Sequence, residues 1–341
     1  MSSISVIGLD IAKNVFQIHG IDESGAVIVR RQLRRGQLLS YFAGLPPCLV
    51  GLEACATGHY WGRELRALGH DVRLIPPQYV KPYVKRNKTD AADAEAICEA
   101  VGRPSMHFVG IKSAEQQAIM VLHRARDLLV RQRTMAINAL RGHMAEFGVV
   151  EAQGIAGAMR LVAVLADEED ERIPPLARRV LAELVGQLRG TMARIAALER
   201  EMKAWHKASD VSRRLATIPG VGPVTATALA ATVPDASAFS SGRQFAAWLG
   251  LTPRQYSTGG KPRLGGISKR GDGYLRRLLM TGATAALRRS KQTRARPWVQ
   301  ELLKRRPAKV VAVALANKTA RTAWALMKTG EAYRAPTPAA G

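Results

Sequence analysis

The first hundred residues alternate between short β-type runs and helix-type stretches, and this order restricts the possible folds more than any other feature of the sequence. Three apolar runs come first, joined by links of only a few residues, which favours an antiparallel meander. Two further β-type runs follow, separated by stretches with helical periodicity. The predicted strands are 4–12, 15–22, 26–33, 48–54 and 71–77, and the predicted helices are 37–44, 59–70, 78–85 and 90–101.

The order β-β-β-α-β-α-β-α is that of the RNase H-like, or RuvC-like, fold, so we expect an α/β domain at the start of the chain. Apolar residues spaced by three and four over 113–147 and 175–206 predict two long helices that form an antiparallel coiled-coil arm. The remainder is predicted to be all-α apart from a glycine-rich loop at 257–272. The predicted domains are therefore 1–108 (RuvC/RNase H-like), 109–208 (helical or coiled-coil arm), 209–334 (basic C-terminal domain) and 335–341 (disordered tail).

The charge of the chain favours a polyanionic partner. The formal net charge is +24, and residues 207–341 hold 24 Lys/Arg against 5 Asp/Glu, a net of +19. Nucleic acid is the simplest partner for such a surface, with a ribosomal or membrane-surface protein as the competing interpretation. No long apolar run predicts a membrane span and no signal peptide is visible. Three cysteines without disulfide spacing indicate reduced thiols, so we expect a cytoplasmic protein.

Four carboxylates follow the predicted strands and open the last helix of the first domain. Asp10 ends the first strand in GLDIAK, Glu53 ends the fourth in GLEAC, and Asp90 and Asp93 lie in KTDAADA. In an RNase H-like sheet the first and fourth strands are neighbours, so these ends meet the start of that helix. Carboxylates this close repel each other unless a cation lies between them, and oxygen ligands select Mg²⁺ or Mn²⁺. Two such ions can catalyse phosphoryl transfer.

Each of these carboxylates also has a structural interpretation when taken alone. Asp10 could cap a turn, and Glu53 could pair with an arginine. Asp90 could be the N-cap of its helix and Asp93 could stabilise the first turn through the helix dipole. The combination of two strand-end acids with a D-x-x-D helix start favours the metal-binding interpretation.

The C-terminal part carries motifs suited to phosphate backbones. IPGVGP between two helical stretches resembles a helix-hairpin-helix turn, in which Gly220 and Gly222 let the backbone approach a phosphate; a tight helix–helix turn is the alternative. The glycine-rich loop interleaves glycines with cations, and a basic helix follows it. No zinc-ligand spacing and no Walker motif occurs. The predicted contacts to nucleic acid are Gly220, Gly222, Gly259, Gly260, Lys261, Arg263, Lys269, Arg270, Arg276 and Arg277.

Four motifs together resemble one family. GLDIAK, GLEAC, NKTDAADA and the stretch from LATIPGVGP to KRGDGYLRRLL are similar to the DEDD-type transposases of the "IS-one-ten" insertion-sequence family and its "IS-eleven-eleven" branch, of which the pilin-gene invertase is a relative. The resemblance covers residues 3–330. It implies that the four carboxylates form the acidic tetrad and that a serine in the C-terminal domain is the nucleophile. That residue is Ser257, or Thr258 if the alignment shifts by one position.

The resemblance further implies partners that composition and periodicity do not indicate. These are donor and target DNA, a structured bridge RNA that pairs with both, and a homo-oligomer, from dimer to tetramer, with composite active sites. The leading hypothesis is a Mg²⁺-dependent transposase or recombinase with a serine nucleophile. A structure-specific, Holliday-junction-type endonuclease would use water instead and would not need Ser257. A non-catalytic nucleic-acid-binding protein with a degenerate nuclease fold is the third hypothesis, and the intact tetrad argues against it.

Overall fold

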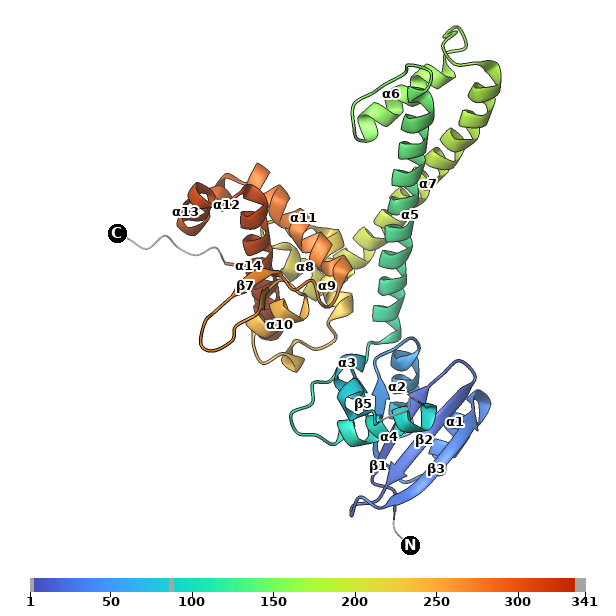
Figure 1. Cartoon of the computed structure of the whole chain (residues 1–341), viewed down its shortest axis with the longest axis vertical. Coiled ribbons are helices and arrows are strands. Elements are labelled where there is room, and N and C mark those ends of the chain that lie inside the picture. Colours follow the sequence, from blue (N-terminus) through green and yellow to red (C-terminus); the bar gives the residue numbers. More distant parts are fainter. Residues whose placement is uncertain (1–2, 86–88, 335–341) are drawn as a thin grey trace. The chain divides into compact units, whose positions relative to one another are not determined.

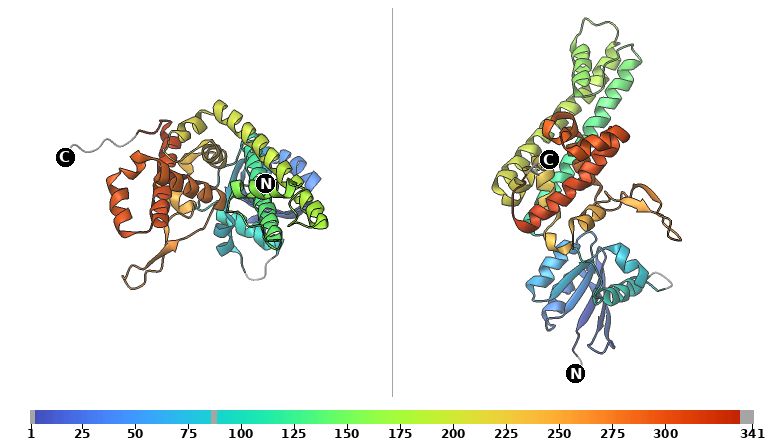
Figure 2. Two further views of the ribbon diagram at one scale, coloured as in Figure 1. Left: turned by 90° about the horizontal axis from the view of Figure 1, so that it is seen from above. Right: turned by 90° about the vertical axis from the view of Figure 1, so that its left-hand side faces the viewer.

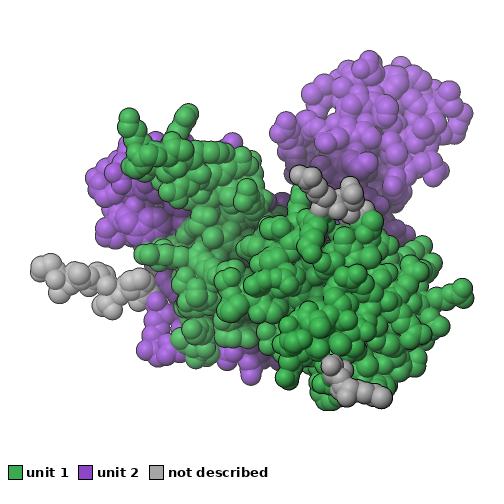
Figure 3. Space-filling view, turned by 60° about the horizontal axis from the view of Figure 1, so that its bottom comes forward, with its two compact units in different colours: residues 1–117, 230–273, 317–330 green, residues 118–229, 274–316, 331–341 purple. Residues whose placement is uncertain are grey.

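A computed structural model describes residues 3–85 and 89–334 of the chain. The predicted disordered tail at 335–341 lies outside the described residues. The chain divides into two compact units, coloured separately in Figure 3, and the C-terminal part of the sequence contributes segments to both. Unit 1 comprises residues 1–117, 230–273 and 317–330, and unit 2 comprises 118–229, 274–316 and 331–341.

Unit 1 contains a five-stranded sheet with the strand order β3-β2-β1-β4-β5 (Figure 1). The first three strands pair antiparallel as a meander, whereas β4 pairs parallel to β1 and β5 parallel to β4. The predicted meander followed by crossover strands is thus confirmed, and the fold is mixed α/β. The strands are β1 (Val6–Ile11), β2 (Val15–Ile21), β3 (Val27–Arg34), β4 (Leu49–Glu53) and β5 (Asp71–Ile75).

Helices cover both faces of this sheet because the strand residues alternate between them. Ile7 and Leu9 of β1 are fully buried in a core that also contains side chains of α1 and α2. Gly8, between them, faces α4 on the opposite side. The helices of this region are η1 (Arg35–Gln37), α1 (Leu38–Ala43), α2 (Gly58–Ala67), α3 (Pro77–Val80), η2 (Lys81–Tyr83) and α4 (Asp90–Val101).

Three helices form the extended part of unit 2. α5 (Ala114–Ala145) and α7 (Pro175–Ala208) match the two long helical stretches expected from the sequence, and they lie alongside each other in Figures 1 and 2. α6 (Ile155–Ala166) lies between them in sequence and had not been predicted. Buried side chains of all three helices, among them Leu140, Leu161 and Leu188, share one apolar core. No helix in the described ranges is both long and apolar enough to cross a bilayer.

The C-terminal part is not all-α as predicted. β6 (Pro253–Gln255) and β7 (Leu264–Ile267) form an antiparallel hairpin, with β7 inside the stretch expected to be a loop and β6 just before it, where helix was expected. Gly259 and Gly260 both have positive φ, which suits the two-residue turn of a tight hairpin. The strands escaped prediction because they are short and largely exposed, and neither PRQ in β6 nor LGGI in β7 alternates apolar with polar residues. The helices are α8 (Asp210–Ala216), α9 (Pro223–Thr232), η3 (Ala236–Ala238), α10 (Gly242–Trp248), α11 (Gly273–Arg289), α12 (Lys291–Arg294), α13 (Pro297–Arg305) and α14 (Ala308–Thr329).

A buried hydrogen-bond chain joins three of the helices of unit 2. The Thr227 hydroxyl donates to the carbonyl oxygen of Pro223 at 2.8 Å, so its oxygen accepts from His123 Nε2 at 3.0 Å. The other ring nitrogen, Nδ1, then accepts from the Tyr274 hydroxyl at 3.0 Å. His123 is fully buried. Because every donor in this series of hydrogen bonds has an acceptor, the series fixes one neutral tautomer of the His123 ring. It also links α5, α9 and α11.

The stability of unit 2 is expected to fall on mild acidification because of this histidine. Burial, and then the charge of Arg126, lower the pKa of His123 to about 4 from its usual 6.5. As the pH falls, His123 is therefore protonated in the unfolded chain before it is protonated in the folded one. The contribution of the neutral, buried ring to the free energy of unfolding is complete above pH 6.5 and is lost as the pH falls towards 4. From pH 7 to pH 5 the expected loss is about 2 kcal/mol of unfolding free energy.

Urea unfolding at the two pH values measures this loss. The variant His123→Gln has no titrating ring, so its unfolding free energy should change less between pH 7 and pH 5 than that of the unsubstituted chain. Equal pH dependence in both proteins would show that the ring does not titrate on unfolding in this range.

Candidate metal centre

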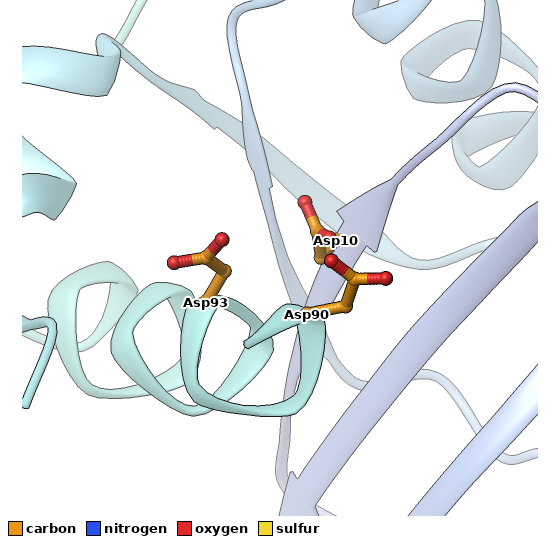
Figure 4. A group of neighbouring side chains, drawn as sticks. All are labelled: Asp10, Asp90 and Asp93. Atoms are coloured by element: carbon orange, nitrogen blue, oxygen red, sulfur yellow. The ribbon is translucent and has the colours of Figure 1, made fainter. Parts of the chain in front are cut away.

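Three carboxylates converge near the C-terminal end of β1, the central strand of the sheet. Ligand oxygens of Asp10, Asp90 and Asp93 all lie within 4.8 Å of one another. Asp10 projects from β1, and the other two project from the first turn of α4 into the same space (Figure 4). Asp90 is exposed, whereas Asp10 and Asp93 are half-buried. The structure thus brings together three of the four predicted metal ligands.

The start of α4 explains why two of these carboxylates remain available. Thr89 is the N-cap, and its Oγ1 accepts a hydrogen bond from the backbone N–H of Ala92 at 3.2 Å. The alternative in which Asp90 is the N-cap is therefore wrong. With Thr89 as cap, Asp90 and Asp93 fall three residues apart on one helix face. In the part of the chain that the structure describes, neither carboxylate has a salt-bridge partner.

Glu53 lies on the strand next to Asp10 but outside the group of three. In the parallel register Leu9 is opposite Leu52, so Asp10 and Glu53 are the next residues along β1 and β4. Both leucines face the core under α1 and α2, which places the two acids on the opposite face, where α4 packs. Burial, then Glu53 and more weakly Asp10, raise the pKa of the Cys55 thiol, which keeps it protonated beside the carboxylates.

These residues fit a divalent metal ion. Three carboxylates within 4.8 Å of one another repel when ionised, and a cation between them removes that repulsion. All donor atoms are oxygens, which suits a hard ion such as Mg²⁺ or Mn²⁺ rather than zinc. Such an ion, when bound, supplies positive charge at the attacking and leaving oxygens of a phosphoryl transfer.

A glycine that the sequence reasoning overlooked sets the distance between β1 and α4. A Cβ on Gly8 would lie 2.1 Å from the carbonyl oxygen of Ala94 and 2.4 Å from the backbone nitrogen of Cys98. Backbone atoms cannot move aside without shifting the helix. Gly8 thus permits the close approach that holds Asp10 beside the first turn of α4. Its signal in the sequence is a glycine two residues before the acid in the middle of an apolar strand.

Gly8→Ala is expected to separate the carboxylates as well as to destabilise unit 1. The added methyl forces α4 away from β1, at a cost of about 3 kcal/mol in unfolding free energy. Chemical unfolding measures that cost, and titration with Mn²⁺ under native conditions measures the loss of metal affinity. Gly36→Ala is the control, because a Cβ there would meet nothing within 4 Å. Unchanged metal affinity in Gly8→Ala would show that this contact does not set the site.

The predicted nucleophile lies just after β6, on the hairpin. Ser257 Oγ accepts hydrogen bonds from the backbone N–H of Arg263 at 3.2 Å and from Nε2 of Gln255 at 3.1 Å. Both contacts use the oxygen as acceptor, so they orient the side chain and leave its proton unengaged. Thr258 begins the turn, and its carbonyl oxygen accepts from the Lys261 N–H at 3.0 Å. Both hydroxyl residues are exposed.

The predicted nucleic-acid contacts have different surroundings. Lys261, Arg263, Lys269 and Arg270 are exposed on or beside the hairpin. Gly259 and Gly260 form the turn of that hairpin, whereas Gly220, Gly222, Arg276 and Arg277 lie in unit 2. A Cβ on Gly222 would meet nothing within 4 Å, and the side chain of Arg276 is half-buried.

Two of those residues have structural roles in unit 2. Gly220 has a φ of +87°, and a Cβ on it would lie 2.6 Å from the carbonyl oxygen of Gly282 in α11, so this glycine serves packing as well. Arg277 forms an ion pair with Asp127 and lies over the ring of Tyr274. Contact with nucleic acid stays a prediction for all ten residues.

Comparison with known proteins gives matches over nearly the whole chain. A profile described as "Transposase IS116/IS110/IS902 family" matches residues 212–297, and a profile of IS110-type DEDD transposases matches 7–148. A "Probable family 20 transposase" of Pseudomonas aeruginosa is 54% identical over 97% of this chain and 99% of its own length. The "Transposase for insertion sequence element IS1111A" of Coxiella burnetii is 43% identical over 98% and 92%. The "Pilin gene-inverting protein" of Moraxella bovis is 25% identical over 75% and 74%.

Proposed function

Since this chain belongs to the IS110/IS1111 family of insertion-sequence transposases, with an RNase H-like DEDD domain followed by a helical transposase domain, we propose that it cleaves and rejoins DNA strands with a serine nucleophile and Mg²⁺ or Mn²⁺. The observation that carries the proposal is the convergence of Asp10, Asp90 and Asp93 within 4.8 Å. Glu53, the next acid along the neighbouring strand, completes the tetrad.

The hydroxyl of Ser257 attacks the phosphorus of a DNA backbone phosphodiester. A bond forms between Oγ and phosphorus, the ester bond to one sugar oxygen breaks, and that oxygen takes a proton to become a free hydroxyl. The reverse attack, by the hydroxyl end of another strand, releases the serine and joins the strands in a new combination. The hydrogen bonds from Arg263 and Gln255 support this role because they orient Oγ and stabilise negative charge on it.

The substrates are donor and target DNA, and the exposed cations of the hairpin hold their phosphates. Lys261 and Arg263 supply positive charge next to the proposed nucleophile, and Arg270 adds exposed charge beyond the end of β7. A structured bridge RNA guides the choice of both DNA sites, and the working form is a homo-oligomer of two to four chains. These partners rest on the family resemblance, as does action in the bacterial cytosol or nucleoid.

A covalent-adduct assay tests the proposal. The full chain is incubated with donor DNA, target DNA, RNA transcribed from the flanks of the element, and Mg²⁺ or EDTA, and then run on a denaturing gel. A slow-migrating protein–DNA species that forms only with the metal is expected. Peptide mapping of that species should place the phosphate on Ser257 or Thr258. Metal-dependent strand cleavage without any adduct would instead favour the endonuclease that uses water.

A further inference from the structure

The edge strand β3 and the residue that follows it form a basic stretch. Four arginines, Arg30, Arg31, Arg34 and Arg35, occur within six residues that include no acid. All four are exposed, and β3 belongs to the same sheet as the strands that carry Asp10 and Glu53. Because successive side chains of a strand point to opposite faces, these arginines cannot all serve one surface.

The pairing of the strands assigns two of the arginines to the face of the metal centre. Gln32 on β3 is opposite Gln17 on β2, and Gln17 is opposite Asp10 on β1. Directly opposite residues of antiparallel strands share one face of the sheet. Arg30 and Arg34, two residues away on either side of Gln32, lie on that face as well. We call Arg30, Gln32 and Arg34 the β3 row.

The other two arginines lie on the opposite face, where α1 and α2 cover the core. Arg31 is opposite the buried Ile18, and its guanidinium lies 5.6 Å from the centre of the Tyr41 ring. The guanidinium of Arg35 lies 4.9 Å from the centre of the Trp61 ring. These cation–π contacts give Arg31 and Arg35 a structural role within unit 1.

The β3 row places exposed positive charge on the face that carries the acids. On this face α4 packs against β1, β2 and β4, whereas Arg30 and Arg34 are exposed. Burial lowers the pKa of His19, Glu95 opposes that shift, and the charge of Arg30 adds to it. Glu95 is itself paired with Lys85 at 2.6 Å. A polyanion that reaches the carboxylates through a bound cation would meet the two guanidinium groups on the same face.

The distance from Asp10 to the β3 row suits a phosphate backbone. Strands of a sheet lie about 4.8 Å apart, and β3 is two strands away from β1, so Gln32 is about 10 Å from Asp10 across the sheet. With one phosphate per about 3.4 Å of helix axis, about three phosphates of one DNA strand span that distance. Arg30 and Arg34 lie about 7 Å from Gln32 on either side, so the row offers a line of donors to a strand that crosses the sheet.

We propose that the β3 row binds the backbone of the DNA strand that is cut at the carboxylates, about three nucleotides from the cut. The inference rests on the proposed function, because it takes Asp10, Asp90 and Asp93 as the place of cleavage. The two guanidinium groups contact phosphate oxygens, and the Gln32 amide donates to a phosphate or sugar oxygen. Such contacts position the strand and read no sequence, so these are positioning residues.

Two double variants of the full chain test the β3 row. Arg30→Gln/Arg34→Gln and Arg31→Gln/Arg35→Gln each remove two positive charges from the same stretch, but from opposite faces of the sheet. Mobility-shift assays with donor DNA in EDTA, where the DNA is not cut, measure affinity at several salt concentrations. The first variant is expected to bind about tenfold more weakly, with a slope of log affinity against log salt that is smaller by about two.

The second variant is expected to bind within about twofold of the unsubstituted chain, with nearly the same slope. Circular dichroism of both variants checks that the sheet stays folded. Equal affinities of the two double variants would overturn the proposal. A loss of affinity for the RNA alone, with unchanged affinity for DNA, would overturn it as well.

Uncharged phosphates in the DNA locate the contact. Donor DNA is prepared with a single methylphosphonate at each position near the cut, which the unsubstituted chain maps with Mg²⁺. We expect its binding to weaken about tenfold when the uncharged linkage lies about three nucleotides from the cut. The same linkage should cost Arg30→Gln/Arg34→Gln little, because the charges that it would meet are already absent.

Equal losses in the two proteins at every position would overturn the proposal. A failure of the proposed chemistry is distinguishable from this result. It would appear as DNA binding by the unsubstituted chain without any covalent adduct, whatever the β3 row does.

Discussion

Ser257→Ala is expected to abolish the covalent protein–DNA species, with a loss of at least about a thousandfold in strand exchange. Alanine removes the oxygen that would bond to phosphorus, and with it the acceptor of the Arg263 N–H and of Gln255 Nε2, whereas the backbone pairs of β6 and β7 do not involve that side chain. DNA binding should stay within about twofold, because the neighbouring cations are retained. Denaturing gels measure the adduct, and filter or mobility-shift assays measure binding.

Thr258→Val is the matched control for this variant. It removes the adjacent hydroxyl while preserving the shape of a β-branched side chain at the start of the hairpin turn, so the adduct should persist. If the adduct instead survives in Ser257→Ala and disappears in Thr258→Val, the nucleophile lies one position later. If cleavage continues without an adduct in both variants and in the unsubstituted chain, water is the nucleophile.

Asp93→Asn is expected to lower strand cleavage by at least about a thousandfold. The change keeps the shape of the side chain but removes one of the three charges that lie within 4.8 Å of one another, and so weakens the hold on a divalent ion. Mn²⁺ affinity, measured by calorimetric titration, should fall together with cleavage. DNA binding without metal should be equal or stronger, because a negative charge has been removed.

Glu95→Gln, two residues further along α4, is the control. Its carboxylate forms an ion pair with Lys85 at 2.6 Å and lies outside the carboxylate group, so metal affinity and cleavage should be unchanged. Loss of activity in Asp93→Asn with undiminished Mn²⁺ affinity would contradict the role of this residue as a ligand. Equal losses in the two variants would point to general damage to α4.

The N-terminal fold and three of the carboxylates were predictable from local patterns. β1 and β4 are apolar runs with an acid as the second-last and the last residue, respectively, and α4 begins at Asp90 as expected because Thr89 is a good N-cap. The hairpin of β6 and β7 was not predictable in this way, since its strands are short and without an alternating pattern and its turn depends on two glycines. α6 was missed because it lies between two longer helices whose periodicity dominates the region.

The packing that makes the site depends on contacts distant in sequence, and these were not visible beforehand. Nothing near Gly8 indicates that the carbonyl oxygen of Ala94 will lie against it. The division into two units was not visible in the sequence either. Residues 230–273 and 317–330 belong to unit 1 although they are far from residues 1–117 in the sequence. The spacing of apolar residues along the sequence indicates whether a segment is a strand or a helix and which of its faces is buried. It does not indicate which other helix or strand packs against that face, and these contacts depend on that packing.

The capped start of α4 limits how related chains can change in length. Thr89 fixes where the helix begins, and Asp90 and Asp93 are counted from that point. One residue inserted between the two acids would turn the second by about 100° around the helix axis, away from Asp10. Insertions and deletions should therefore accumulate elsewhere in homologous chains, and a gap within this single turn would mark a copy that has lost its activity and is decaying as a pseudogene.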